Sequence, residues 1–138
     1  MINGALKDRP AGLTITTHIC RGNFKSTFLF SGGYGPVAKY LAQLDYDGFF
    51  LEYDSDRAGD FSPLATIWNQ RPDVRIVLGL VTSKSGDLED QAAVIKRIHE
   101  AAEHVPLTNL CLSPQCGFAS TEEGNILTED QEWQKLKL

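Results

Sequence analysis

Apolar residues gather in four short runs, and each run is followed by a stretch rich in polar residues or glycine. A strand buried on both faces of a parallel sheet reads as a nearly continuous apolar run, as in the segment VRIVLGLV. The runs therefore predict four β-strands, over residues 13–20, 46–54, 74–83 and 107–114. They begin roughly 30 residues apart, which is close to the length of one βα unit in an eight-stranded barrel.

Helical patterns fill the intervals between these strands. Ser62 is expected to cap a helix that begins with Pro63, and Asp87 to cap the longest helix. Thr128, with Gln131 three residues later, forms a capping-box pattern at the start of a last helix. The other expected helix covers residues 36–44. The longest helix, over residues 87–105, has an apolar stripe formed by Leu88, Ala92, Ile95, Ile98, Ala102 and Val105.

This regular alternation predicts an α/β fold with parallel strands and right-handed crossovers. Four βα units make half of a (β/α)₈ TIM barrel, which needs eight strands to close. Residues 1–138 are therefore expected to form one partial TIM-barrel domain with two open edges and an uncovered interior face. Such a half is expected to pair with a second copy, as a homo-oligomer, or with a complementary N-terminal half-barrel.

Composition narrows the classes of function. The chain has 138 residues, of which 42% are hydrophobic, and this is typical of a soluble globular domain. A net charge of −5 disfavours binding to nucleic acid or to an anionic membrane. No apolar stretch approaches the length of a membrane span, and the N-terminus lacks a signal-peptide pattern. The three cysteines do not suggest a disulfide framework, so a reducing, cytoplasmic location is expected.

Four residues with metal-binding side chains lie at or just beyond the ends of the expected strands. His18 and Cys20 end the first strand, and their spacing of two places both on one face. Glu52 ends the second strand, and Cys116 follows the fourth. The C-terminal ends of parallel strands meet at one rim, where barrel enzymes have their active sites. One imidazole, two thiolates and one carboxylate suit a tetrahedral Zn²⁺ ion.

Each of these residues also has a plain structural interpretation. Glu52 could be a surface acid, and Cys116 could be an inert buried thiol. Cys111, between two leucines in the fourth strand, is interpreted as a core residue. Arg21 and Asn23 follow the first strand, and two roles remain open for them: to orient ligands or substrate, or to cap a loop.

Two further segments are interpreted structurally. GGYGPVA (Gly32 to Ala38) partly resembles a dinucleotide-binding loop, but its glycines are expected to form a turn before a helix. The charged segment from Asp54 to Asp60, which includes Arg57, is interpreted as a solvated loop, although Asp54 could reach the rim of the site.

Four motifs, in order, carry a family resemblance: THICRGNF, GFFLEYD, VLGLVTSKSGDLED and LCLSPQCGFASTEEGN. The chain resembles the C-terminal half of the catalytic barrel, about strands 5–8, of the cobalamin-independent methionine synthase family, and is most similar to its short single-barrel members. The resemblance implies zinc held by His18, Cys20, Glu52 and Cys116. It also implies methyl transfer from a 5-methyltetrahydrofolate-like donor to the thiolate of homocysteine, which yields methionine.

The chain departs from the family pattern in two respects. Lys84 occupies the loop where the long enzymes of the family have a proton-donating histidine, so it is the candidate proton donor or partner of an anionic substrate group. The first four βα units, with most substrate contacts, are absent, which leaves Asp54, Arg21 and Asn23 as candidate substrate-binding residues. Two alternatives stay open: a zinc-dependent thiol methyltransferase that uses a corrinoid or small methyl donor, and an inactive zinc-binding half-barrel that acts as an interaction module.

Overall fold

A four-stranded, all-parallel sheet with strand order β1-β2-β3-β4 forms the centre of the protein. The computed structural model describes residues 1–119 and 121–138. Each strand lies within the segment expected from the apolar runs, so the predicted α/β fold with parallel strands is confirmed. The strands are β1 (Thr16–Ile19), β2 (Gly48–Glu52), β3 (Arg75–Val81) and β4 (Leu110–Pro114).

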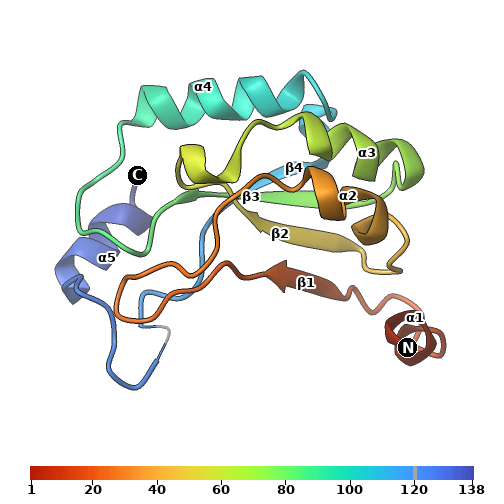
Figure 1. Cartoon of the computed structure of the whole chain (residues 1–138), viewed down its shortest axis with the longest axis horizontal. Helices are drawn as coiled ribbons and strands as arrows, with labels where there is room; N and C mark the ends of the chain where they lie inside the picture. The colour runs from red at the N-terminus through yellow and green to blue at the C-terminus, as the bar shows by residue number, and fades with distance from the viewer. Residues whose placement is uncertain (120) are drawn as a thin grey trace.

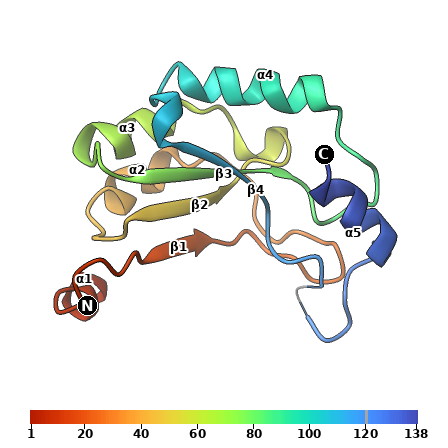
Figure 2. The same ribbon diagram turned by 180° about the vertical axis from the view of Figure 1, so that it is seen from behind.

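Helices follow the strands and complete four βα units. Those that connect the strands, α2, α3 and α4, lie together on one side of the sheet, whereas α5 lies beyond the C-terminal ends of the strands (Figures 1 and 2). None of the described helices is long and apolar enough to cross a membrane. The helices are α1 (Ile2–Leu6), α2 (Gly35–Leu41), α3 (Ser62–Gln70), α4 (Gln91–Ala102) and α5 (Glu129–Leu136), and the 3₁₀ turns are η1 (Asp56–Ala58) and η2 (Leu107–Asn109).

One hydrophobic core joins the sheet to these helices. Phe49 and Leu51 of β2 and Leu78 of β3 are almost fully buried and pack with Leu64 and Ile67 of α3. Because side chains alternate along a strand, the residues between them face the other side of the sheet. The hydrophobic core therefore lies on the face of the sheet that the helices cover, and the other side chains of the strands point to the opposite face.

The opposite face is crossed by a row of residues paired in register. This row consists of His18, Phe50, Val77 and Cys111. Cys111 is exposed, so its interpretation as a core residue is wrong. Its neighbours in sequence are apolar, but β4 is an edge strand and Cys111 lies on the face opposite the helices. Alternation reveals which residues share a face, but not which face another element covers.

The longest helix begins later than its pattern indicates. Asp90, rather than Asp87, caps α4 by accepting a hydrogen bond from Ala93 N at 2.7 Å. Leu88 consequently lies outside the helix and is exposed. Buried Val94 and Ala101, with partly buried Ile98, form its core-facing side, so the stripe predicted through Leu88 and Ile95 is shifted around the helix.

Two other helix starts test the capping predictions. The capping box of α5 is confirmed, because the side chains of Thr128 and Gln131 each bond the backbone N–H of the other residue. Ser62 was expected to cap α3 from outside, but it is the first helical residue. Asp60 accepts hydrogen bonds from both the backbone N and the hydroxyl of Ser62, at 2.9 and 2.5 Å.

Candidate metal centre

The four predicted metal ligands converge at the C-terminal ends of three strands. His18 lies in β1 with Cys20 just after it, Glu52 is the last residue of β2, and Cys116 follows β4 by two residues. His18 Nε2 is 3.1 Å from Glu52 Oε1, and Cys116 Sγ is 2.7 Å from the same oxygen. Cys20 Sγ lies 3.6 Å from Cys116 Sγ. Parallel pairing thus brings together residues that are 96 positions apart.

These distances can be compared with those of a tetrahedral zinc site. Bonds of about 2.0–2.3 Å to nitrogen, oxygen and sulfur place neighbouring ligand atoms about 3.3–3.8 Å apart. The separation of the Cys20 and Cys116 sulfur atoms falls in this range. The contacts of Glu52 Oε1 with His18 and Cys116, at 3.1 and 2.7 Å, are shorter than this range. The donor set suits zinc, and the donor atoms of His18, Glu52 and Cys116 lie within 4.8 Å of one another, with Cys20 joined to this group through Cys116.

Glu52 is the most buried of the four candidate ligands, with a side chain that is 1% exposed. Burial acts to raise the pKa of Glu52, but hydrogen bonds from His18 and Cys116, the charge of Lys84 and a hydrogen bond from Arg57 outweigh it. The resulting pKa is about 2. Glu52 is therefore ionised at neutral pH, as a metal-binding carboxylate must be.

The pKa of Cys116 shifts in the opposite direction. Burial, followed by the hydrogen bond to Glu52 and its negative charge, raises the pKa of the Cys116 thiol well above its ordinary value. Protonated Cys116 therefore donates its S–H to the Glu52 carboxylate. A divalent cation between these groups would reverse this preference, because a coordinated thiol loses its proton.

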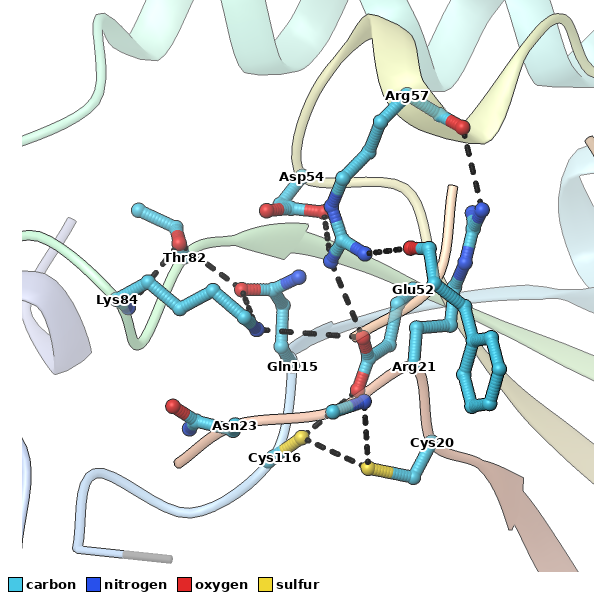
Figure 3. A network of polar contacts seen from close by, with 12 residues as sticks. Cys20, Arg21, Asn23, Glu52, Asp54, Arg57, Thr82, Lys84, Gln115 and Cys116 are labelled. Carbon is cyan, nitrogen blue, oxygen red and sulfur yellow. Dashed lines mark hydrogen bonds and ion pairs between the residues drawn. The ribbon is translucent and has the colours of Figure 1, made fainter. Parts of the chain in front are cut away.

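Arg57 and Asp54 belong to the site, contrary to the interpretation of their segment as a solvated loop. Their side chains are only 7% and 8% exposed. Arg57 Nη2 donates to Glu52 Oε2 at 3.2 Å and to Asp54 Oδ1 at 2.8 Å (Figure 3). Asp56 and Asp60 are exposed, as expected of loop residues. Proximity in sequence to Glu52 was the only signal for Arg57, and spacing alone does not tell where a loop side chain points.

Lys84 reaches the same site from the loop after β3. Its Nζ lies 4.0 Å from Glu52 Oε2 and donates to Gln115 Oε1 at 3.2 Å (Figure 3). Gln115 also accepts from Thr82 Oγ1 at 2.9 Å and from Ser83 N at 3.3 Å. No motif in the sequence singles out Gln115, although it immediately precedes Cys116.

Arg21 and Asn23 are both buried beside the ligands. Arg21 donates to the backbone carbonyls of Gly32 and Arg57, the latter at 3.1 Å. Asn23 donates to Ser83 Oγ at 3.1 Å, which connects the loop after β1 with the loop after β3. Both residues thus connect the loops that surround the candidate metal centre.

The glycine-rich turn before α2 also contributes to the site. Tyr34, within this turn, accepts a hydrogen bond from Glu52 N at 2.7 Å, and its hydroxyl lies 3.3 Å from Glu52 O. Gly33 packs against the next loop, where an added Cβ would lie 3.3 Å from Ala58 O. The turn precedes a helix, as the sequence indicated, and it fixes the backbone of a ligand. Nothing in the sequence marks Tyr34 as a contact of Glu52.

Comparison with known proteins supports the resemblance seen in the motifs. Residues 9–130 match the family described as cobalamin-independent synthase, catalytic domain. Two uncharacterized proteins of Bacillus subtilis (strain 168), YxjH and YxjG, are 61% and 57% identical to the chain over 137 residues, or 99% of it. The chain spans 36% of the length of each of them.

Two solved structures share the fold. One is a candidate vitamin-B12-independent methionine synthase from Listeria monocytogenes, with 46% identity and a TM-score of 0.71 over 99% of this chain and 36% of that one. The other is a B12-independent methionine synthase from Shewanella sp. W3-18-1 in complex with selenomethionine, with 20% identity and a TM-score of 0.71 over 91% and 37% of the two chains. The chain therefore belongs to the cobalamin-independent methionine synthase family, of whose barrel it contains four βα units.

Proposed function

We propose that this chain carries the zinc centre of a methionine-synthase-type methyltransferase, with His18, Cys20, Glu52 and Cys116 as ligands. The observation that carries the proposal is the convergence of His18, Glu52 and Cys116 at the strand ends, with their donor atoms within 4.8 Å of one another. Cys20 Sγ lies 3.6 Å from Cys116 Sγ, beside this group. A zinc ion bound there would hold the sulfur of homocysteine as a thiolate at neutral pH.

The charges of the ligands suit alkyl transfer to sulfur. Two thiolates and one carboxylate more than neutralise a divalent ion, which keeps a further bound thiolate electron-rich and nucleophilic. In the proposed reaction, the substrate sulfur forms a bond to the methyl carbon while the bond from that carbon to the donor nitrogen breaks. The nitrogen of the 5-methyltetrahydrofolate-like donor then takes up a proton.

Lys84 is our candidate for the source of that proton, or for binding an anionic substrate group. Its ammonium group is close to both Glu52 and Gln115, on the ligand side of the sheet. For Asp54, Arg21 and Asn23 we propose a role in forming the rim that receives the substrate. Since zinc needs reduced thiols, the proposal also places the protein in a reducing compartment such as the cytoplasm.

We propose that a complementary half-barrel or a second copy completes the substrate pocket. This chain spans 36% of its curated relatives, and the sheet face that carries His18 and Cys111 has exposed side chains. Beside the centre, Phe24, Leu29 and Phe30 are also exposed. Residues 1–138 would act as one half-barrel domain, and a complementary N-terminal half-barrel or a second copy would cover this face.

Zinc content tests the metal claim directly. Protein purified without chelators should contain about one equivalent of zinc, measured by inductively coupled plasma mass spectrometry. Cys116→Ser should lose most of this zinc, whereas Cys111→Ser, which changes an exposed thiol of β4, should retain it. Equal zinc in both variants would place the metal elsewhere.

Methionine formation tests the reaction. The protein is incubated with homocysteine and 5-methyltetrahydrofolate, alone and with the remaining part of a relative such as YxjH, and methionine is measured by mass spectrometry. We expect methionine only when the other half is present and Cys116 is intact. Turnover with methylcobalamin or a small methyl donor instead would support the alternative methyltransferase. Zinc binding without turnover in any combination would support an inactive interaction module.

A further inference from the structure

The two oxygens of the Glu52 carboxylate have different partners. Oε1 faces the ligand cluster, 3.1 Å from His18 Nε2 and 2.7 Å from Cys116 Sγ. Oε2 faces the cations, 3.2 Å from Arg57 Nη2 and 4.0 Å from Lys84 Nζ. We infer that Arg57 is a positioning residue that holds Oε2, so that Glu52 presents Oε1 alone to the metal. This inference rests on the proposed zinc function.

Arg57 can orient the Glu52 carboxylate because hydrogen bonds hold its own guanidinium group in place. Nη2 donates to Asp54 as well as to Glu52, and Nη1 donates to Phe30 O at 3.0 Å. The ring of Phe28 lies 4.7 Å from the guanidinium carbon. A planar group with hydrogen bonds in several directions and a stacked ring has little freedom to rotate, and it presents one N–H to Glu52 in a set direction.

The backbone of Arg57 connects Glu52 with the segment that follows Cys20. The Arg57 carbonyl accepts hydrogen bonds from Gly32 N at 2.8 Å and from Arg21 Nη2 at 3.1 Å. Arg57 itself lies in η1, five residues after Glu52. Arg57 thereby links the Glu52 carboxylate to the loop that follows Cys20 (Figure 3).

Lys84 does not supply the same constraint. At 4.0 Å its ammonium group is beyond hydrogen-bond distance of Glu52 Oε2, so it contributes charge without direction. Its hydrogen bond goes to Gln115 instead. The geometry therefore assigns the orientation of Glu52 to Arg57, and Lys84 adds to the positive potential that keeps Glu52 ionised.

The test compares Arg57→Met with Arg57→Lys and with a matched control, Arg71→Met. Like Arg57, Arg71 donates to the backbone and pairs with an aspartate. Its partners, Leu44, Tyr46 and Asp73, precede β2 and β3 at the opposite end of the sheet. Zinc affinity is measured on folded protein by competition with a chromophoric chelator. Loss of an outer-shell partner is expected to weaken zinc binding about 10- to 100-fold in Arg57→Met. Arg71→Met should stay within about twofold of the parent.

Two further measurements separate positioning from stability. The visible spectrum of the Co²⁺-substituted protein reports the ligand set, and it should change in Arg57→Met but not in Arg71→Met. Arg57→Lys keeps the charge without the planar donor, so it should restore folding while zinc affinity remains below that of the parent. If Arg57→Met does not fold, Arg57→Lys alone decides the question by the same affinity and spectral criteria.

The outcomes distinguish this inference from the proposal beneath it. Parent protein that binds no zinc would refute the proposed function, and the inference with it. Parent protein that binds zinc, with folded Arg57 variants of equal affinity and unchanged Co²⁺ spectra, would refute only the positioning role.

Discussion

Acid titration of Glu52 should reveal how strongly the site stabilises the metal-free fold. The perturbation is Glu52→Gln, a neutral side chain of the same shape that stands in for the protonated acid. In the folded protein the pKa of Glu52 is lowered from its ordinary value of 4.5 to about 2, where burial is outweighed by hydrogen bonds and positive charge. A group with a lowered pKa stabilises the fold above its unfolded pKa and loses this contribution as the pH falls.

The magnitude follows from the two pKa values. Each tenfold difference in acid dissociation corresponds to about 1.36 kcal/mol, so ionised Glu52 contributes about 3 kcal/mol at neutral pH. This contribution should be complete above about pH 5 and disappear by about pH 2. The variant lacks the titrating group, so the stability difference between parent and variant should shrink by about 3 kcal/mol over this range.

Urea unfolding of metal-stripped protein, followed by circular dichroism at several pH values, measures this difference. Taking the difference between parent and variant removes the contributions of the other carboxyl groups, which titrate in both proteins. A difference that stays constant from neutral pH to about pH 2 would refute the reasoning, because Glu52 would then have the same pKa folded and unfolded.

Three other substitutions test the packing and hydrogen bonds that support the site. Tyr34→Phe removes the acceptor of Glu52 N, and leaving that buried N–H unpaired should cost about 1–3 kcal/mol in urea unfolding; an unchanged midpoint would contradict this. Asp90→Ala should lower the free energy of unfolding by about 1 kcal/mol in thermal unfolding, and Asp87→Ala should lower it less. A larger loss for Asp87→Ala would mean that Asp87 caps α4. Ile67→Ala should cost about 2–5 kcal/mol through a core cavity, and a loss below about 1 kcal/mol would mean that α3 is loosely packed.

The strands, and the placement of the candidate ligands at one rim of the sheet, could be predicted because each depends on a local signal. An apolar run such as VRIVLGLV must be buried on both faces, and parallel pairing then brings its end beside the ends of its neighbours. His18, Glu52 and Cys116 were found for this reason. The start of α4 was misplaced because Asp87 and Asp90 are both good caps, and only the packing of Val94 and Ala101 decides between them.

The residues around the ligands could not be predicted, because their roles depend on the path of loops. Arg57 follows Glu52 by five residues, but its side chain reaches back only because the Gly32 backbone and Arg21 hold the η1 turn in place. Tyr34 reaches Glu52 from a turn that the sequence indicates only as a turn. In each case a contact distant in sequence sets the direction of the side chain.

The charge balance of the candidate metal centre explains why Arg57 and Lys84 lie near one oxygen of Glu52. Glu52 is ionised and buried, and an unpaired buried carboxylate would be costly. Arg57 and Lys84 both approach Oε2, which leaves Oε1 facing His18 and Cys116. If the cations lay on the side of Oε1, they would compete with a metal ion for the same oxygen. Their position instead keeps Glu52 charged and leaves Oε1 available to the metal ion that we propose.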